Sequence, residues 1–214
     1  MFAYGLGPYL DSHATVAIGA LVLCLTLFVC TGMIYACIKF LQEWASRLTV
    51  ANYGVLGCAS GFTLATAFAA FTAGGLVPGF ALAAMVLTAL GLATRSASLL
   101  RNSRLRPKSS LQTATGIRHP RIKQTQQGFM GGSHNTREFF RGRCHALLRS
   151  VKWGFLVPAF ALPLPLLLGV GWRSGSTLAL CLAFVVQYTG LIAERWFFFA
   201  QANHPQNLYF QAIK

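Results

Sequence analysis

Charged residues are scarce in this sequence, and acidic ones are the scarcest. Only 10% of its 214 residues are Asp, Glu, Lys or Arg, whereas a soluble domain of this size would contain about a quarter. Hydrophobic residues make up 55% of the chain, and its mean hydropathy is +0.54. This composition excludes an ordinary soluble domain and indicates an integral membrane protein.

The sequence also lacks the residue patterns on which many redox centres and enzymes depend. None of its five histidines lies deep in an apolar run, so a haem b held between two histidines is not expected. Its six cysteines include no C-x-x-C pair, which argues against zinc and iron-sulfur centres. Phosphate-loop, nucleophile-elbow and H-E-x-x-H patterns are absent. We therefore expect a chain that binds no cofactor of its own and is not an enzyme by itself.

Long apolar runs are what the sequence does contain, and a helix needs roughly 20 residues to cross the hydrocarbon core. No charged residue occurs from 48 to 94, and the glycines and proline at 74–79 divide this stretch into two spans. The expected spans are residues 14–38, 49–73, 77–94, 153–172 and 174–199. We predict an all-α polytopic membrane helix bundle, a single domain over residues 1–214 with five transmembrane helices and one long basic loop.

Two local patterns refine this prediction. Gly57 and Gly61 form a small-x-x-x-small pair in the second span, which we interpret as a helix-packing face. The fourth span contains Pro158, Pro163 and Pro165, which a membrane helix tolerates when its neighbours satisfy the freed carbonyls. We expect this span to be kinked.

A long basic segment, residues 95–152, separates the third span from the fourth. It holds 13 of the 18 Lys and Arg residues and a single acid, Glu138. Because basic residues beside membrane helices stay on the cytoplasmic side, we predict that this loop is cytoplasmic. The N-terminus would then lie outside and the C-terminus inside. Residues 95–106 could prolong the third helix out of the bilayer as far as Pro107.

The end of the basic segment has a pattern of its own. From about Thr136 to Lys152, apolar and basic residues occupy separate faces at helical spacing. Two alternatives remain open, a helix lying in the headgroup layer and an upstream extension of the fourth span. Arg137, Arg141 and Arg149 are the candidate residues for docking a partner subunit or anionic lipids.

Glu194 is the acid that lies closest to an apolar run. An ionisable residue at membrane depth is a functional candidate. Its neighbour Arg195 offers a simpler explanation, which is a local ion pair at the membrane edge. The residues alone leave both explanations open.

Four extended strings of the chain are similar to those of a known family. They are GMIYACIKFLQEW, LTVANYGVLGCASGFTLATAFAA, IRHPRIKQTQQGFMGGSHNTREFFRGR and LIAERWFFFAQANHPQNLYF. Together they resemble the membrane anchor subunits of the dimethyl sulfoxide reductase type. The resemblance extends over nearly the whole chain, from about residue 15 to the end.

The resemblance implies a multi-pass anchor in the bacterial inner membrane that carries no haem and oxidises menaquinol or ubiquinol in anaerobic respiration. Such an anchor passes electrons to an iron-sulfur subunit, which supplies a molybdopterin catalytic subunit. Glu194 and Arg195 are then the candidate quinol-site residues, with Glu194 as the proton acceptor. The alternative is a small transporter or a structural membrane protein, although charge confined to helix ends and loops does not suggest a transport path.

The sequence departs from that family in one respect. The anchors it resembles have more membrane helices than the five readable here, and their first part contains a His-Leu-Gly motif associated with quinol oxidation. No His-Leu-Gly occurs in this chain. We therefore expect a shortened chain that lacks the N-terminal helices of the family and does not form a full quinol site alone.

Overall fold

Long helices make up most of the computed structural model, which describes residues 7–106, 108–122, 145–172 and 176–202. The elements are α1 (Gly7–Ala36), α2 (Arg47–Thr72), η1 (Gly74–Leu76), α3 (Val77–Ser103), α4 (Leu111–Thr115), α6 (His145–Leu156), η2 (Val157–Ala161), α7 (Pro163–Trp172) and α8 (Thr177–Ala200). Five stretches of the described residues are long and apolar enough to cross a membrane. The predicted all-α membrane bundle is therefore confirmed.

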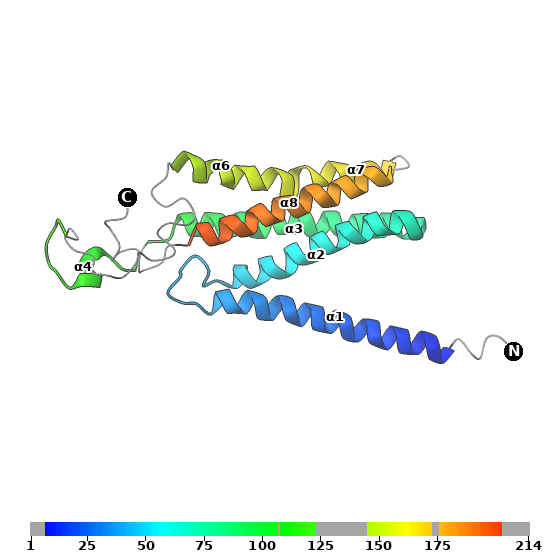
Figure 1. The fold of residues 1–214 in the computed structure, drawn as a ribbon, viewed down its shortest axis with the longest axis horizontal. Coiled ribbons are helices and arrows are strands. Elements are labelled where there is room, and N and C mark those ends of the chain that lie inside the picture. The colour runs from blue at the N-terminus through cyan, green and yellow to red at the C-terminus, as the bar shows by residue number, and fades with distance from the viewer. Residues whose placement is uncertain (1–6, 107, 123–144, 173–175, 203–214) are drawn as a thin grey trace, which may run out of the picture.

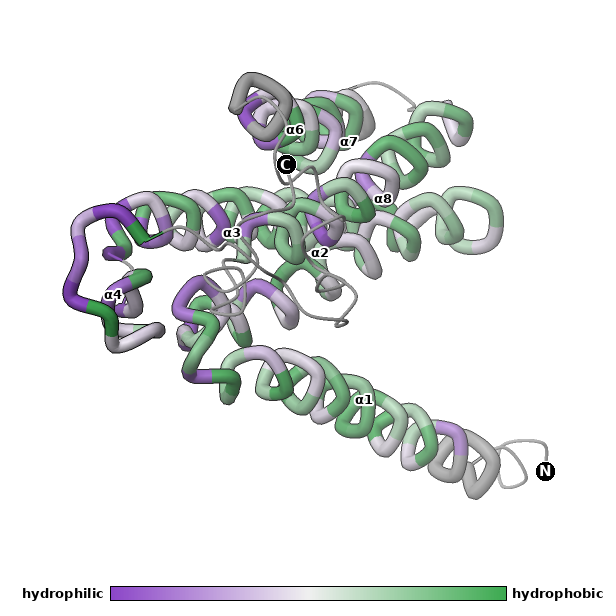
Figure 2. The backbone as a smooth tube through the Cα atoms, turned by 60° about the vertical axis from the view of Figure 1, so that its left-hand side comes forward, coloured by the Kyte–Doolittle hydropathy of each residue, from purple (hydrophilic) through white to green (hydrophobic). Residues whose placement is uncertain are grey.

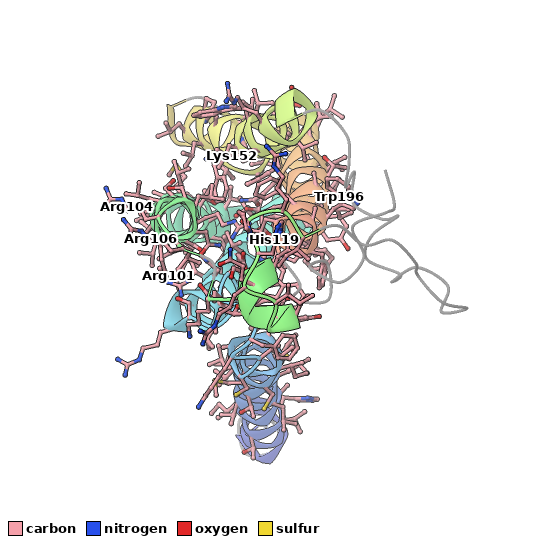
Figure 3. The ribbon with its side chains drawn as sticks, turned by 90° about the vertical axis from the view of Figure 1, so that its left-hand side faces the viewer. Arg101, Arg104, Arg106, His119, Lys152 and Trp196 are labelled. Atoms are coloured by element: carbon pink, nitrogen blue, oxygen red, sulfur yellow. The ribbon has the colours of Figure 1, made fainter. Side chains whose placement is uncertain are left out.

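The helices alternate in direction, so that their polar connections gather at one end. In Figure 1, α1, α3 and α8 finish at the end of the bundle where α2 and α6 begin and where α4 lies. Hydrophilic residues concentrate there, whereas the helices themselves are mainly hydrophobic (Figure 2). Figure 3 looks onto this end. Arg101 belongs to the last turn of α3, Arg104 and Arg106 follow that helix, and Lys152 belongs to α6. We call this end of the bundle the basic end; its cytoplasmic location stays a prediction.

Helix α2 occupies a central place in the bundle and contacts α1, α3 and α8. Its inward face repeats every three or four residues, as a single helical face requires. Its buried residues are Thr49, Asn52, Leu56, Ala59, Thr63 and Thr66, followed near the end of the helix by Ala67 and Ala69. The Thr63 and Thr66 hydroxyls donate to carbonyls of the preceding turn, at 2.9 and 2.7 Å, which satisfies them inside the bundle.

Helix α1 packs against α2 where glycines allow close approach. A Cβ atom on Gly57 would lie 2.6 Å from the ring of Phe28, and one on Gly32 would lie 2.8 Å from the Cα of Val50. Gly61, in contrast, has no neighbour within 4 Å of such an atom. The packing interpretation of the small-x-x-x-small pair therefore holds for Gly57 and fails for Gly61.

The fourth span is built from α6, the π-helical segment η2 and α7. Pro158 lies in η2, and because proline has no N–H it cannot make a regular helical hydrogen bond. The Leu162 amide instead donates to the Val157 carbonyl, five residues back, at 3.0 Å. The span therefore contains a π-helical turn at Pro158, and the predicted kink stays a prediction. Helix α6 begins at His145 and continues directly into η2. From His145 onward, the alternative of an upstream extension of the fourth span is therefore the correct one.

Helix α8 contacts this π-helical segment at Gly190. A Cβ atom there would lie 2.7 Å from the Cα of Ala159 and 2.7 Å from the carbonyl carbon of Pro158. The two backbones are therefore in direct contact. Because Glu194 follows one turn later on α8, this contact helps to set the position of the site described next.

Candidate functional site

Arg95 corrects the predicted boundary of the basic loop. Helix α3 continues to Ser103, in agreement with the predicted prolongation of the third helix. The prediction, however, places Arg95 in the loop, whereas it is only 1% exposed inside the bundle. A prediction from hydropathy places the end of the span before the first charged residue. In the structure, the charge of Arg95 is instead paired with an acid inside the bundle. Nε of Arg95 lies 2.7 Å from Oε1 of Glu194. A buried charge of this kind is stable only when it is paired.

Glu194 lies between two arginines and is completely buried. Its Oε2 accepts a hydrogen bond of 2.6 Å from Nε of Arg195, which confirms the local ion pair that the sequence suggested. Its Oε1 faces Arg95 from α3, a partner that the sequence did not reveal. One carboxylate thus serves two guanidinium groups, which leaves a net charge of +1. We call Arg95, Glu194 and Arg195 the Arg–Glu–Arg cluster.

Aromatic rings cover the guanidinium groups. Cζ of Arg195 lies 4.2 Å from the ring centroid of Tyr53 and 5.2 Å from that of Phe198. Cζ of Arg95 lies 5.8 Å from the ring centroid of Phe155. The negative faces of these rings stabilise the cations without neutralising them. The positive charge of the cluster therefore remains available to a ligand.

A small pocket lies beside the cluster. It is lined by Thr49, Asn52, Tyr53, Arg95, Ser98, Arg195 and Phe198. Its empty space of about 170 Å³ includes the open surroundings, and the gap between the lining side chains is too narrow for a water molecule. A ligand can enter this gap only when the lining side chains move apart. Glu194 is not among the lining residues, although both of its arginine partners are.

The lining offers unpaired hydrogen-bonding atoms. Nη2 of Arg95, Nη1 of Arg195 and Oδ1 of Asn52 are buried without a hydrogen-bond partner. Buried polar groups in folded proteins are normally paired, so such atoms mark a place where a further polar group is to be expected. Two of the three are charged donors. The pocket is therefore suited to a ligand with acceptor oxygens.

The pocket lies close to the basic end. Its residues come from the first turns of α2 and from the last turns of α3 and α8. The connection between α1 and α2 is fastened over this end, since Arg101 donates to the carbonyls of Gln42 and Ala45 at 3.1 and 3.3 Å. Nε1 of Trp44 donates to the Phe198 carbonyl at 3.0 Å, and the two rings stack with centroids 5.2 Å apart. These contacts fix one wall of the pocket.

A second polar contact joins α3 and α8 two turns further into the bundle. Nε2 of Gln187 donates to Oγ1 of Thr88 at 2.9 Å, and both side chains are buried. Gln187 precedes Glu194 by seven residues and Thr88 precedes Arg95 by seven, so each pair shares one helical face. Two polar contacts along one seam fix the register of α8 against α3.

The predicted docking residues do not belong to this site. Arg149 is exposed on α6, while Arg137 and Arg141 lie outside the described residues. Within the part of the chain that the structure describes, no group of three His, Cys, Asp or Glu side chains could hold a metal ion. The expectation that this chain binds no cofactor of its own stays a prediction.

Comparison with known proteins adds a homologue. The chain is 48% identical over 212 residues to a sulfite dehydrogenase subunit of Allochromatium vinosum. The aligned region is 98% of this chain and 65% of that protein, so the chain spans less than two thirds of the relative's length. No family model matches the sequence, and no solved structure matches the chain. This chain is therefore a homologue of a subunit of a redox enzyme.

Proposed function

We propose that this chain is the membrane subunit of a redox enzyme complex of the sulfite dehydrogenase type and that it exchanges electrons with membrane quinone. Similarity to a sulfite dehydrogenase subunit over 98% of the chain supports the assignment to a complex. Five helices able to cross a membrane support its place there. An iron-sulfur subunit and a molybdopterin catalytic subunit, implied by the resemblance to dimethyl sulfoxide reductase anchors, would carry the remaining redox chemistry.

Electrons move toward the quinone in this proposal. When sulfite is oxidised to sulfate, water supplies the added oxygen atom, and two protons and two electrons are released. A quinone takes up two electrons and two protons to become a quinol. This direction is the reverse of the quinol oxidation that the resemblance implies. One site can serve either direction, since binding and proton transfer are reversible.

The pocket beside the Arg–Glu–Arg cluster is the proposed quinone site. The observation that carries this assignment is that buried, unpaired nitrogens of Arg95 and Arg195 line the same pocket. Quinone carbonyl oxygens accept hydrogen bonds, and bonds from charged donors are the stronger kind. The place near the basic end also suits the exchange of electrons with a subunit bound there.

Each residue has a separate role in this assignment. Arg95 and Arg195 donate to a quinone oxygen, while Tyr53 and Phe198 pack against its ring. Glu194 orients the two guanidinium groups through its two oxygens. Glu194 does not line the pocket, so no contact between its carboxylate and a bound quinone is seen. Its role as a proton acceptor therefore remains a prediction. The docking role predicted for Arg137, Arg141 and Arg149 is part of the same proposal.

Purification from native membranes tests the assignment to a complex. A tagged chain extracted in mild detergent should bring down an iron-sulfur protein and a molybdenum protein in fixed proportion. Metal analysis and optical spectra of the purified material identify both. A chain that is recovered alone would contradict the assignment to a complex, and recovery with a soluble substrate-binding protein would instead support the transporter alternative.

A further inference from the structure

We infer that the segment around α4 is a docking surface for an acidic, water-exposed face of a partner protein. We call this segment, residues 108–122, the α4 lobe. The inference rests on the proposed function, because that proposal supplies the soluble subunits of the complex. It goes further in naming where one of them binds and the charge of the surface with which it binds.

The first step is the position of the lobe beyond the membrane. Helix α3 has 27 residues, so at 1.5 Å per residue its length is about 40 Å. The hydrocarbon core is about 30 Å thick, so the last turns of α3 already pass through the headgroup layer. Figure 1 shows α4 farther out still, beyond the ends of α3 and α8. The lobe is therefore placed to meet a soluble protein rather than lipid headgroups.

The second step is the charge of the lobe. Lys108, Arg118 and Arg121 are exposed, and so is Arg106 immediately before the lobe. No acidic residue occurs from 95 to 122. Within the part of the chain that the structure describes, none of these four cations forms an ion pair. A surface with four uncompensated positive charges is complementary to an acidic surface.

The third step is that hydrogen bonds hold the lobe in one shape. Ser110 and Thr113 form a reciprocal capping box at the start of α4. Gly116 ends this helix with a φ of 71°, a conformation that favours glycine. Nε2 of Gln112 donates to the His119 carbonyl at 3.4 Å, which ties α4 to the segment that follows it. A surface that is already folded loses less conformational entropy when it binds.

The lobe is also fastened to the rest of the bundle. With its amide group oriented to satisfy both atoms, Gln42 donates to the Arg106 carbonyl and accepts from the Lys108 amide, at 3.0 Å each. Gln42 belongs to the connection between α1 and α2, which lies at the basic end. A protein docked on the lobe is therefore held at a fixed place relative to this end of the bundle.

An exposed apolar side chain accompanies these charges. Ile117 is 52% exposed and directly precedes Arg118. Protein interfaces combine a desolvated apolar centre with a polar rim, whereas the headgroup side of a lipid layer offers only polar contacts. The lobe supplies both parts of a protein interface. We therefore assign it to an acidic protein face that contains a small apolar patch.

Co-purification at several salt concentrations tests the inference. A tagged chain is extracted from native membranes in mild detergent, and the iron-sulfur and molybdenum proteins recovered with it are measured by metal analysis. Recovery with the unmodified chain should fall as salt is raised, because salt screens exposed charges. The double variant Arg118→Glu, Arg121→Glu places like charges across the interface and should weaken binding about tenfold at physiological salt.

A matched control reverses two other exposed cations. Lys39 follows the end of α1 and Arg47 begins α2, so both lie outside the lobe. Lys39→Glu, Arg47→Glu makes the same change in net charge and should leave recovery of the partner proteins unchanged. Ile117→Ser should lower recovery by a similar factor at every salt concentration, because it removes an apolar contact and no charge. All the substituted side chains are exposed, so the variants should melt at the same temperature as the unmodified chain.

The outcomes separate this inference from the proposed function. An unmodified chain that brings down no redox partner even at low salt would overturn both. Equal recovery with the unmodified chain and with Arg118→Glu, Arg121→Glu would overturn the docking surface and leave the complex standing. An equal loss with Lys39→Glu, Arg47→Glu would show that net charge rather than the lobe is recognised, which also overturns the inference. If Arg118→Glu, Arg121→Glu keeps its protein partners but loses co-purified anionic phospholipid, the lobe binds lipid instead.

Discussion

Replacing Gly190 by alanine is expected to prevent normal packing of the bundle. The added methyl group would lie 2.7 Å from backbone atoms of Ala159 and Pro158. Overpacking of a core usually costs roughly 1–3 kcal/mol, and here the obstacle is a backbone that cannot rotate away. We therefore expect a loss at or above the upper end of that range, seen as a lower melting temperature and a lower yield of monodisperse protein in detergent.

Gly54→Ala is the matched control for this substitution. Gly54 also lies within a spanning helix, but nothing lies within 4 Å of a Cβ atom built there. Alanine in a helix is favoured over glycine by roughly 0.5–1 kcal/mol, so this variant should melt at the same temperature or higher. Equal melting temperatures for the two variants would contradict the close contact between α8 and η2.

Replacing Glu194 by leucine is expected to have a comparably large effect. The change leaves Arg95 buried without a counter-charge, whereas Arg195 is 28% exposed and can turn toward the surface. Removing one partner of a buried ion pair typically costs about 3–5 kcal/mol. Thermal melting of the detergent-solubilised chain measures this loss.

The double variant Glu194→Leu with Arg95→Met separates the ion pair from the packing around it. Replacing both members of a buried pair by apolar residues is often neutral, so this variant should recover most of the stability lost by Glu194→Leu alone. If the double variant is less stable than Glu194→Leu, the destabilisation does not come from an unpaired Arg95.

Hydropathy was sufficient to predict the five spanning helices and their alternation. It could not predict that Arg95 lies inside one of them, because a count of apolar residues ends at the first charge. A weak signal was present, since Thr88 and Arg95, like Gln187 and Glu194, are seven residues apart on one helical face. Tertiary packing decides which helices face one another, and this pairing cannot be predicted from a single sequence.

The glycines illustrate the same limit. The small-x-x-x-small pattern correctly indicated close packing at Gly57, but only the structure shows that its neighbour is Phe28 and that Gly61 has none. Gly190 had no such pattern around it. The backbone that it contacts, at Pro158 and Ala159, lies in the π-helical turn of another span.

Two assays of one purified complex test most directly whether the Arg–Glu–Arg pocket serves a quinone. The first measures sulfite-dependent reduction of a short-chain quinone, and the second measures sulfite oxidation with ferricyanide, a soluble acceptor that bypasses the membrane site. Arg195→Gln should reduce the first activity about tenfold or more, since a hydrogen bond to a charged group contributes roughly 1.5–3 kcal/mol, and should leave the second unchanged. Arg104→Gln should leave both unchanged. Full quinone reduction by a correctly assembled Arg195→Gln complex would contradict the assignment of the pocket.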